Sequence, residues 1–214
     1  VENWQKYLAV PGLNPSERFM EDQVRIWDVE KNQIVSVPFT AHSFGIAYVH
    51  DDRVYVFATR HEADRPWRHF RFISLSSSDD LVNWTPPVTV IEAENQEHLF
   101  NTAVCHDGRR FVLLYETDDR QWPAFTFKYS ESDDLVHWRR IPGAVYGREK
   151  YVGGPALYFE GGWYYTLYLQ DLNGYHGGTW ETRVTRSRDL VHWEDAPIER
   201  PFLAPNPNHL FASP

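Results

Sequence analysis

The chain has 214 residues, of which 42% are apolar and 16% aromatic, so it carries enough apolar side chain for a folded core and is not a disordered composition. Its formal net charge of −9 argues against a nucleic-acid partner, because phosphate neutralisation needs a basic face. A single cysteine, Cys105, excludes an internal disulfide framework and a multi-cysteine zinc site, and no apolar run approaches the ~20 residues of a membrane span.

The first segment with a strand pattern is QVRIWDVEKNQIVSVP, residues 23–38. Residues 1–41 are too few for a whole unit of the repeat that follows. We therefore interpret this segment as the outer hairpin of a partial unit.

From residue 42 onward the chain repeats itself, which is the sequence signature of a repeat architecture. The phrases SSSDDLVNW, SESDDLVHW and VTRSRDLVHW end at Trp84, Trp138 and Trp193, so these tryptophans lie ~55 residues apart. A strand–turn–strand segment repeats with a similar spacing, and its best alignment places three aromatic residues in register: Tyr55, Phe111 and Tyr164.

Each unit predicts four strands. Two apolar strands flank a tight turn, a third follows a polar loop, and a Pro-containing stretch after the repeated phrase holds a fourth, edge strand. Convincing helix periodicity is absent. Four strands in ~50 residues are typical of a β-propeller blade. We predict one all-β propeller domain over residues 1–214, with blades at about 42–96, 97–149 and 150–206 and a partial blade at 1–41.

The repeated phrase itself has a structural interpretation. Its Ser and Asp oxygens can accept hydrogen bonds from backbone N–H groups in a tight turn. The Leu and Trp that follow are predicted to point inward and to pack between neighbouring blades.

The phrase resembles the S-x-D-L-x-x-W segment of five-bladed propeller glycosidases, such as glycoside hydrolase families 43 and 32, over about residues 44–193. The resemblance implies a five-bladed β-propeller that hydrolyses glycosidic bonds in an axial pocket. Family 43 enzymes commonly carry their catalytic acid in an E-G-P segment, and here YVGGPALYF places Gly153 where that glutamate would stand. The family's D-P base also has no clear match, so its catalytic residues are not transferred.

Three full units and one partial unit do not make a closed ring, and closure is what removes exposed strand edges. The expectation is that a further segment of a longer chain or a second chain completes the propeller. Neither a signal peptide nor a membrane segment is visible, which leaves the compartment open between cytoplasmic and secreted.

Strand direction sorts the polar residues without a structure. The start of strand one, the end of strand two and the start of strand three lie at one end of a blade, and the repeated phrase lies at the other. At the first of these ends the repeats differ, and carboxylates, histidines and tryptophans gather there. Carboxylates supply acid and base groups and indoles supply stacking platforms, which together suit a sugar pocket.

Glycosidic cleavage usually needs two carboxyl groups across the scissile bond, about 5 Å apart for retention or about 6.5–9.5 Å for inversion. The sequence leaves open which carboxyl is the acid and which the base or nucleophile. The catalytic candidates are Glu97, Glu116, Asp171 and Glu181. The predicted substrate contacts are His42, His98, Asn101, His176, Trp180 and Arg183.

Structural roles compete with these assignments. Glu116 and Glu181 are equally able to form structural ion pairs with Arg60 or Arg183, and a scattered histidine is usually a hydrogen-bonded loop residue. No metal motif is readable and no cofactor is predicted, although the resemblance implies that a calcium ion or water can occupy the axial channel.

The predicted partner is therefore a carbohydrate, with neither nucleic acid nor membrane. Other functions remain open at this stage: a non-catalytic carbohydrate-binding propeller, a protein-interaction propeller, and a transferase or phosphorylase variant of the glycosidase.

Overall fold

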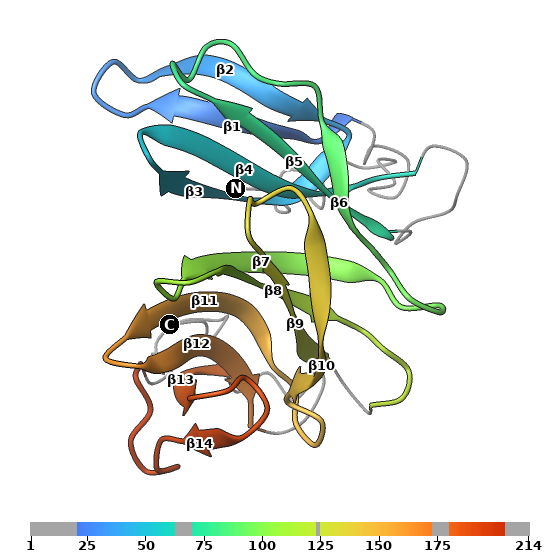
Figure 1. The fold of residues 1–214 in the computed structure, drawn as a ribbon, viewed down its shortest axis with the longest axis vertical. Helices are drawn as coiled ribbons and strands as arrows, with labels where there is room; N and C mark the ends of the chain where they lie inside the picture. The colour runs from blue at the N-terminus through green and yellow to red at the C-terminus, as the bar shows by residue number, and fades with distance from the viewer. Residues whose placement is uncertain (1–20, 63–69, 123–124, 173–179, 204–214) are drawn as a thin grey trace, which may run out of the picture. The chain divides into compact units, whose positions relative to one another are not determined.

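The computed structural model describes residues 21–62, 70–122, 125–172 and 180–203, and these are built from strands (Figure 1). The strands are β1 (Gln23–Asp28), β2 (Gln33–Thr40), β3 (His42–His50), β4 (Arg53–Arg60), β5 (Phe72–Ser78), β6 (Val88–Glu92), β7 (Leu99–His106), β8 (Phe111–Thr117), β9 (Thr126–Ser132), β10 (Trp138–Tyr146), β11 (Gly153–Glu160), β12 (Trp163–Asp171), β13 (Trp180–Ser187) and β14 (Trp193–Asp195).

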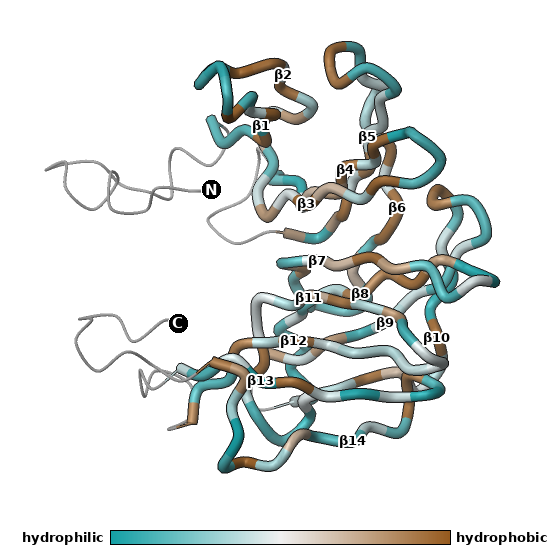
Figure 2. The backbone as a smooth tube through the Cα atoms, turned by 90° about the vertical axis from the view of Figure 1, so that its left-hand side faces the viewer, coloured by the Kyte–Doolittle hydropathy of each residue, from teal (hydrophilic) through white to brown (hydrophobic). Residues whose placement is uncertain are grey.

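The strands form one two-stranded sheet, β1–β2, and three four-stranded sheets, β3–β6, β7–β10 and β11–β14. Strands that follow one another along the chain are neighbours in each sheet, and the recorded pairings are antiparallel, as in a propeller blade. A hairpin over the predicted segment is confirmed as β1–β2, and the predicted fourth strands are β6, β10 and β14. Long apolar stretches run along strands such as β7 and β8 (Figure 2).

The chain divides into two compact units. The first comprises residues 1–94 and 98–100, and the second comprises residues 95–97 and 101–214. The first unit therefore holds β1–β2 and β3–β6, and the second holds β11–β14 and nearly all of β7–β10. The prediction of a single domain over the whole chain stays a prediction.

The predicted alignment of the first repeat is wrong by one residue. Ser78, the serine two residues before Asp80 of the turn, pairs with Val54 in β4. Its counterparts Ser132 and Ser187 pair with Phe111 in β8 and Tyr164 in β12. Val54, not Tyr55, is thus the equivalent residue. Strands that are buried on both faces lack a polar–apolar alternation that would fix the register in the sequence.

The repeated phrase forms the predicted hydrogen-bonded turn. In the third copy, Asp189 Oδ1 accepts hydrogen bonds from the backbone N–H groups of Val191 (2.9 Å) and His192 (2.8 Å). Ser187 Oγ accepts a hydrogen bond from the N–H of Leu190 at 2.8 Å. Leu190 has a positive φ of 67°, a conformation that is uncommon for leucine and that these bonds hold in place.

The other two copies repeat this geometry almost atom for atom. Asp134 accepts backbone hydrogen bonds at 2.9 and 2.8 Å, and Asp80 accepts them at 2.9 and 2.7 Å. Leu81 and Leu135 have φ values of 64° and 66°. The hydrogen bonds of Asp80, Asp134 and Asp189 hold the pKa of each carboxyl well below its usual range.

The leucine and tryptophan of the phrase pack between sheets, as predicted. In the second unit Leu190 is fully buried, and Trp193 stacks on Tyr129 of the preceding sheet with ring centroids 5.2 Å apart. In the first unit Trp84 packs with the apolar cluster around Phe39. Leu81 differs, because it remains 37% exposed.

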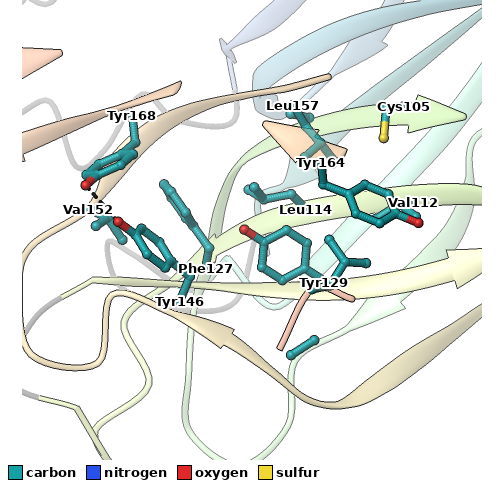
Figure 3. Close-up of a cluster of buried hydrophobic side chains, with 13 residues drawn as sticks. Cys105, Val112, Leu114, Phe127, Tyr129, Tyr146, Val152, Leu157, Tyr164 and Tyr168 are labelled. Carbon is teal, nitrogen blue, oxygen red and sulfur yellow. Dashed lines mark hydrogen bonds between the residues drawn. The ribbon is translucent and has the colours of Figure 1, made fainter. Parts of the chain in front are cut away.

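The core of the second unit lies between sheets β7–β10 and β11–β14 (Figure 3). Val112 and Leu114 of β8 are fully buried there, together with the aromatic rings of Phe127, Tyr129 and Tyr168. One face of β7–β10 is therefore sealed by the sheet that follows it, which fixes the ends of both sheets relative to each other.

Candidate functional site

The strand ends that the sequence singles out lie together in each sheet. Thr117, the last residue of β8, pairs with Thr126, the first residue of β9. Asp171 at the end of β12 pairs with Trp180 at the start of β13. We call this the mouth end of each sheet, opposite the end that carries the Asp-Leu turn.

Glu116 lies at the mouth end of β8 and is buried against the neighbouring sheet of its own unit. Its Oε2 accepts hydrogen bonds from Asn101 Nδ2 at 2.9 Å and from the backbone N–H of Gly154 at 3.0 Å. Gly154 has a φ of +55° in an irregular stretch of β11, a conformation that favours glycine. Both donors are uncharged, and among the described residues no cation contributes to the shift in the pKa of Glu116.

Burial raises the pKa of Glu116 to about 7. The hydrogen bonds from Asn101 and Gly154 oppose the shift, and the negative charge of Asp118 adds to it. A carboxyl with this pKa is half protonated near neutral pH, which is the state that a general acid or base requires.

The equivalent position in the first unit shows what the fold alone needs there. Thr59 of β4 donates a hydrogen bond from Oγ1 to the carbonyl oxygen of Phe100, at 3.1 Å. It thus links β4, the second strand of its sheet, to β7, just as Glu116 links β8 to β11. Because a neutral hydroxyl is enough to make this link between sheets, the fold does not require a carboxyl group at the position of Glu116.

Glu97 has a different environment, although it belongs to the same mouth end. Its Oε2 lies 2.5 Å from Lys128 Nζ and accepts a hydrogen bond from Thr117 Oγ1 at 2.8 Å. The same ammonium group lies 2.7 Å from Asp119 Oδ2, and Arg140 is 3.7 Å from the other Glu97 oxygen. The result is a buried ion cluster.

The structure does not bring Glu97 and Glu116 together as one acid–base pair. Successive side chains of a strand point to opposite faces of its sheet. Glu97 bonds to Thr117, the residue after Glu116 in β8, and therefore lies on the face away from Glu116.

The remaining candidates of the second unit lie on β12 and β13. Asp171 is buried, and the ring of Trp180 packs edge-on against Tyr151 at a centroid distance of 4.9 Å. Glu181 forms an ion pair with Arg183, one of the structural alternatives considered from the sequence. Arg183 also donates a hydrogen bond to the backbone carbonyl of Ile198 at 2.7 Å, so its guanidinium group is held by the protein.

The two described histidine candidates belong to the first unit. His42 is buried between Ser74 Oγ, 3.0 Å from Nε2, and the carbonyl oxygen of Thr40, 2.8 Å from Nδ1. Burial lowers the pKa of His42 to about 4, so its imidazole is neutral at pH 7. His98 packs edge-on near Phe100. His176 lies outside the described residues.

Two polar groups at the mouth ends escaped the sequence analysis. One is the ion pair of Lys128 with Asp119. Lys128 occupies the position that Ser74 and Arg183 hold in the other two repeats, but the alignment alone does not reveal its partner. The other is in the first unit, where Ser43 Oγ lies 2.7 Å from both Asp22 Oδ2 and His61 Nε2. No motif spacing marks either group, because strand pairing assembles them from separate segments.

Among the residues that the structure describes, no group of three or more His, Cys, Asp and Glu side chains is placed to hold a metal ion. Within the same residues there is no helix that is both long and apolar enough to span a bilayer.

Comparison with known proteins places the fold. The β-fructofuranosidase of Bombyx mori, from glycoside hydrolase family 32, is 18% identical with a TM-score of 0.60, and the match covers 75% of this chain and 35% of that one. A thermostable family-43 glycoside hydrolase is 15% identical with a TM-score of 0.56, covering 78% and 55%. A family-117 glycoside hydrolase from Zobellia galactanivorans is 11% identical with a TM-score of 0.58, covering 86% and 63%.

The fold is that of the β-propeller glycoside hydrolases. The chain spans between about a third and two thirds of the length of these structures. No family model matches the sequence, and no curated protein matches it. The predicted fold class, an all-β propeller with three four-stranded blades and a partial one, is confirmed, and at these identities the likeness concerns the fold.

Proposed function

We propose that the protein is a glycoside hydrolase that cleaves an oligosaccharide or polysaccharide by carboxylate acid–base catalysis at the mouth ends of its sheets. The fold supports the reaction class, because the similar structures named above are glycoside hydrolases. The observation that carries the proposal is the Glu116 carboxyl, which is buried, bound by neutral donors and half protonated near pH 7.

Glu116 is the proposed proton donor to the glycosidic oxygen. Asn101 and the Gly154 N–H fix its Oε2, which leaves Oε1 to carry the proton. Its ability to donate depends on a pKa close to the working pH, and burial without a cation provides that pKa.

The candidates for the second carboxyl are Asp171, Glu97 and Glu181, and Asp171 lies on the face of β12 opposite to Tyr168, which packs toward β7–β10. Glu97 and Glu181 each contact a cation, which suits a structural role. Asp171 is paired across the strands with Trp180, whose indole provides a stacking platform for a sugar ring.

A non-catalytic carbohydrate-binding protein is the second candidate, and Gly153 favours it. The family resemblance places a catalytic glutamate at this position, yet a Cβ on Gly153 would meet the Tyr151 hydroxyl at 3.0 Å. Tyr151 thus narrows the space for a side chain at residue 153, where the family's catalytic acid is expected. If no other carboxyl took over the role of that acid, the protein would bind a carbohydrate without cleaving it.

Glu116→Gln tests the proposal, since it keeps the shape and the hydrogen bonds but cannot donate a carboxyl proton. Release of reducing sugar from a panel of plant and microbial oligosaccharides should fall by about 10²–10⁴-fold in this variant. Glu160→Gln, at an exposed residue at the other end of β11, is the matched control and should keep full activity.

Undiminished turnover in Glu116→Gln would remove Glu116 from the mechanism. Sugar binding by the unmodified protein with no turnover of any panel member would favour the carbohydrate-binding alternative. Activity that required added inorganic phosphate would indicate a phosphorylase.

A further inference from the structure

The two hydrogen-bond donors of Glu116 come from equivalent positions of consecutive repeats. Asn101 lies in β7 and Gly154 in β11. Their separation in the sequence is the same as that of Phe111 and Tyr164, the equivalent residues of β8 and β12. Both donate to one oxygen of Glu116, Oε2, at 2.9 and 3.0 Å. The placement of the two segments that carry the donors therefore decides how the carboxyl is held.

A charged residue lies four positions before each donor, and each of these residues forms an ion pair. Before the first donor stands Glu97, whose Oε2 is 2.5 Å from Lys128 Nζ. Before the second stands Lys150, whose Nζ is 2.6 Å from Asp195 Oδ2. The charges are reversed between the two repeats, but both repeats keep an ion pair at this place. An anchor upstream of the donor is thus a shared feature of the two segments.

The anchor at Lys150 is built from aromatic and charged groups. Its Nζ donates a hydrogen bond to the Tyr168 hydroxyl at 3.2 Å and lies 4.7 Å from the centre of the Tyr146 ring. The Tyr146 hydroxyl lies 2.7 Å from the Tyr168 hydroxyl (Figure 3) and 2.6 Å from Asp195 Oδ1. Burial opposes ionisation of Asp195, but hydrogen bonds from Lys150 and Tyr146 outweigh it and lower the pKa of that carboxyl. The ion pair is therefore present at neutral pH.

The segment of residues 150–154 ends in two glycines, Gly153 and Gly154. Glycine has more backbone freedom to lose than any other residue, so contacts elsewhere in the segment must fix its direction. Val152 provides one contact, because it is fully buried and its N–H donates to the carbonyl of Phe125 at 3.3 Å. Lys150 provides another at the far end of the segment. Two separate contacts prevent the segment from pivoting about either one.

We propose that Lys150, paired with Asp195, is a positioning residue for Glu116. It holds residues 150–154 where the N–H of Gly154 reaches the carboxyl. The inference rests on the acid–base role proposed for Glu116. Among the described residues, Asp118 is the charged group that shifts the pKa of Glu116. Lys150 therefore acts on the carboxyl through Gly154 and not through its own charge.

Lys150→Met and Asp195→Asn each remove the ion pair, and Asp195→Asn does so without changing the size of the side chain. The N–H of Gly154 should then exchange with solvent at least about 10-fold faster, as measured by ¹⁵N NMR on the full chain. The hydrogen bond from Gly154 stabilises the ionised form of Glu116. Its loss should therefore raise the titration midpoint of Glu116 by about half a pH unit to one pH unit.

Glu194→Gln is the matched control. Glu194 precedes Asp195 in β14 and pairs with Arg186 at 2.8 Å, and both of these side chains are largely exposed. The control removes an ion pair from the same strand without touching Lys150, so it should leave the Gly154 exchange rate and the Glu116 midpoint unchanged. Asp195→Asn gives an independent reading if Lys150→Met fails to fold.

The proposal requires both changes. It would be overturned if Lys150→Met and Asp195→Asn kept either the Gly154 exchange rate or the Glu116 midpoint of the control. Both measurements follow the carboxyl and its donor directly and need no turnover. Retained turnover in Glu116→Gln would therefore overturn the proposed function alone, whereas an unchanged midpoint here would overturn the positioning role alone.

Discussion

The two ends of each four-stranded sheet follow different rules. At the turn end, three copies of one phrase give the same hydrogen bonds to within 0.1 Å, as in Asp134 and Asp189. At the mouth end, one equivalent position holds Ser74, Lys128 or Arg183, and each makes different contacts. The fold fixes the turn end, whereas the mouth end is free to carry chemistry.

The contrast also separates two carboxyl groups of the mouth end. Glu97 is buried with Lys128, and Glu116 is buried with neutral donors only. Burial alone would raise the pKa of any carboxyl, and a nearby cation opposes that rise. Glu97 therefore suits a structural role and Glu116 an acid–base role.

Removing the cation from the ion cluster should have the largest effect. Lys128→Met leaves Glu97 and Asp119 buried without their shared ammonium group, which should lower the free energy of unfolding by about 3–5 kcal/mol. Urea denaturation measures the change. Lys31→Met, at a surface pair with a side chain that is 69% exposed, should change it by less than about 1 kcal/mol.

A loss below about 1 kcal/mol in Lys128→Met would show that the cluster is hydrated, and the distinction between Glu97 and Glu116 would then weaken.

The turn end can be tested within the repeat itself. Leu190→Ala removes a fully buried side chain and should cost about 2–4 kcal/mol. Leu81→Ala, in the same turn geometry but at a residue that is 37% exposed, should cost less than about 1 kcal/mol. Equal thermal destabilisation of the two variants would contradict the view that inter-sheet packing, more than the turn, gives this leucine its importance.

Sequence reasoning reached the repeats, the strand order and the turn chemistry, because these depend on local patterns. It placed the Ser and Asp of the phrase in the turn and the leucine and tryptophan between sheets, as the structure shows for Leu190 and Trp193. It misaligned Val54 by one residue, since strands buried on both faces do not reveal their register.

The environment of the candidate site was beyond the sequence for a different reason. Glu116 and Glu97 are both glutamates near strand ends, and only strand pairing gives one of them Lys128 and the other Asn101. The same limit applies to Ser43, Asp22 and His61, which come together from three separate segments.

The most direct test of the central claim is a pH titration of the Glu116 carboxyl, monitored by ¹³C NMR or isotope-edited infrared spectroscopy. The signal of Glu116 is identified by its absence from the spectrum of Glu116→Gln. A midpoint near pH 7 is predicted. Because the folded-state pKa is raised above the unfolded value, the stability it contributes is present in acid and lost as the pH rises through 7. Glu116→Gln should therefore gain up to about 3 kcal/mol relative to the unmodified protein between pH 5 and 8. A carboxyl already ionised at pH 5 would contradict the account.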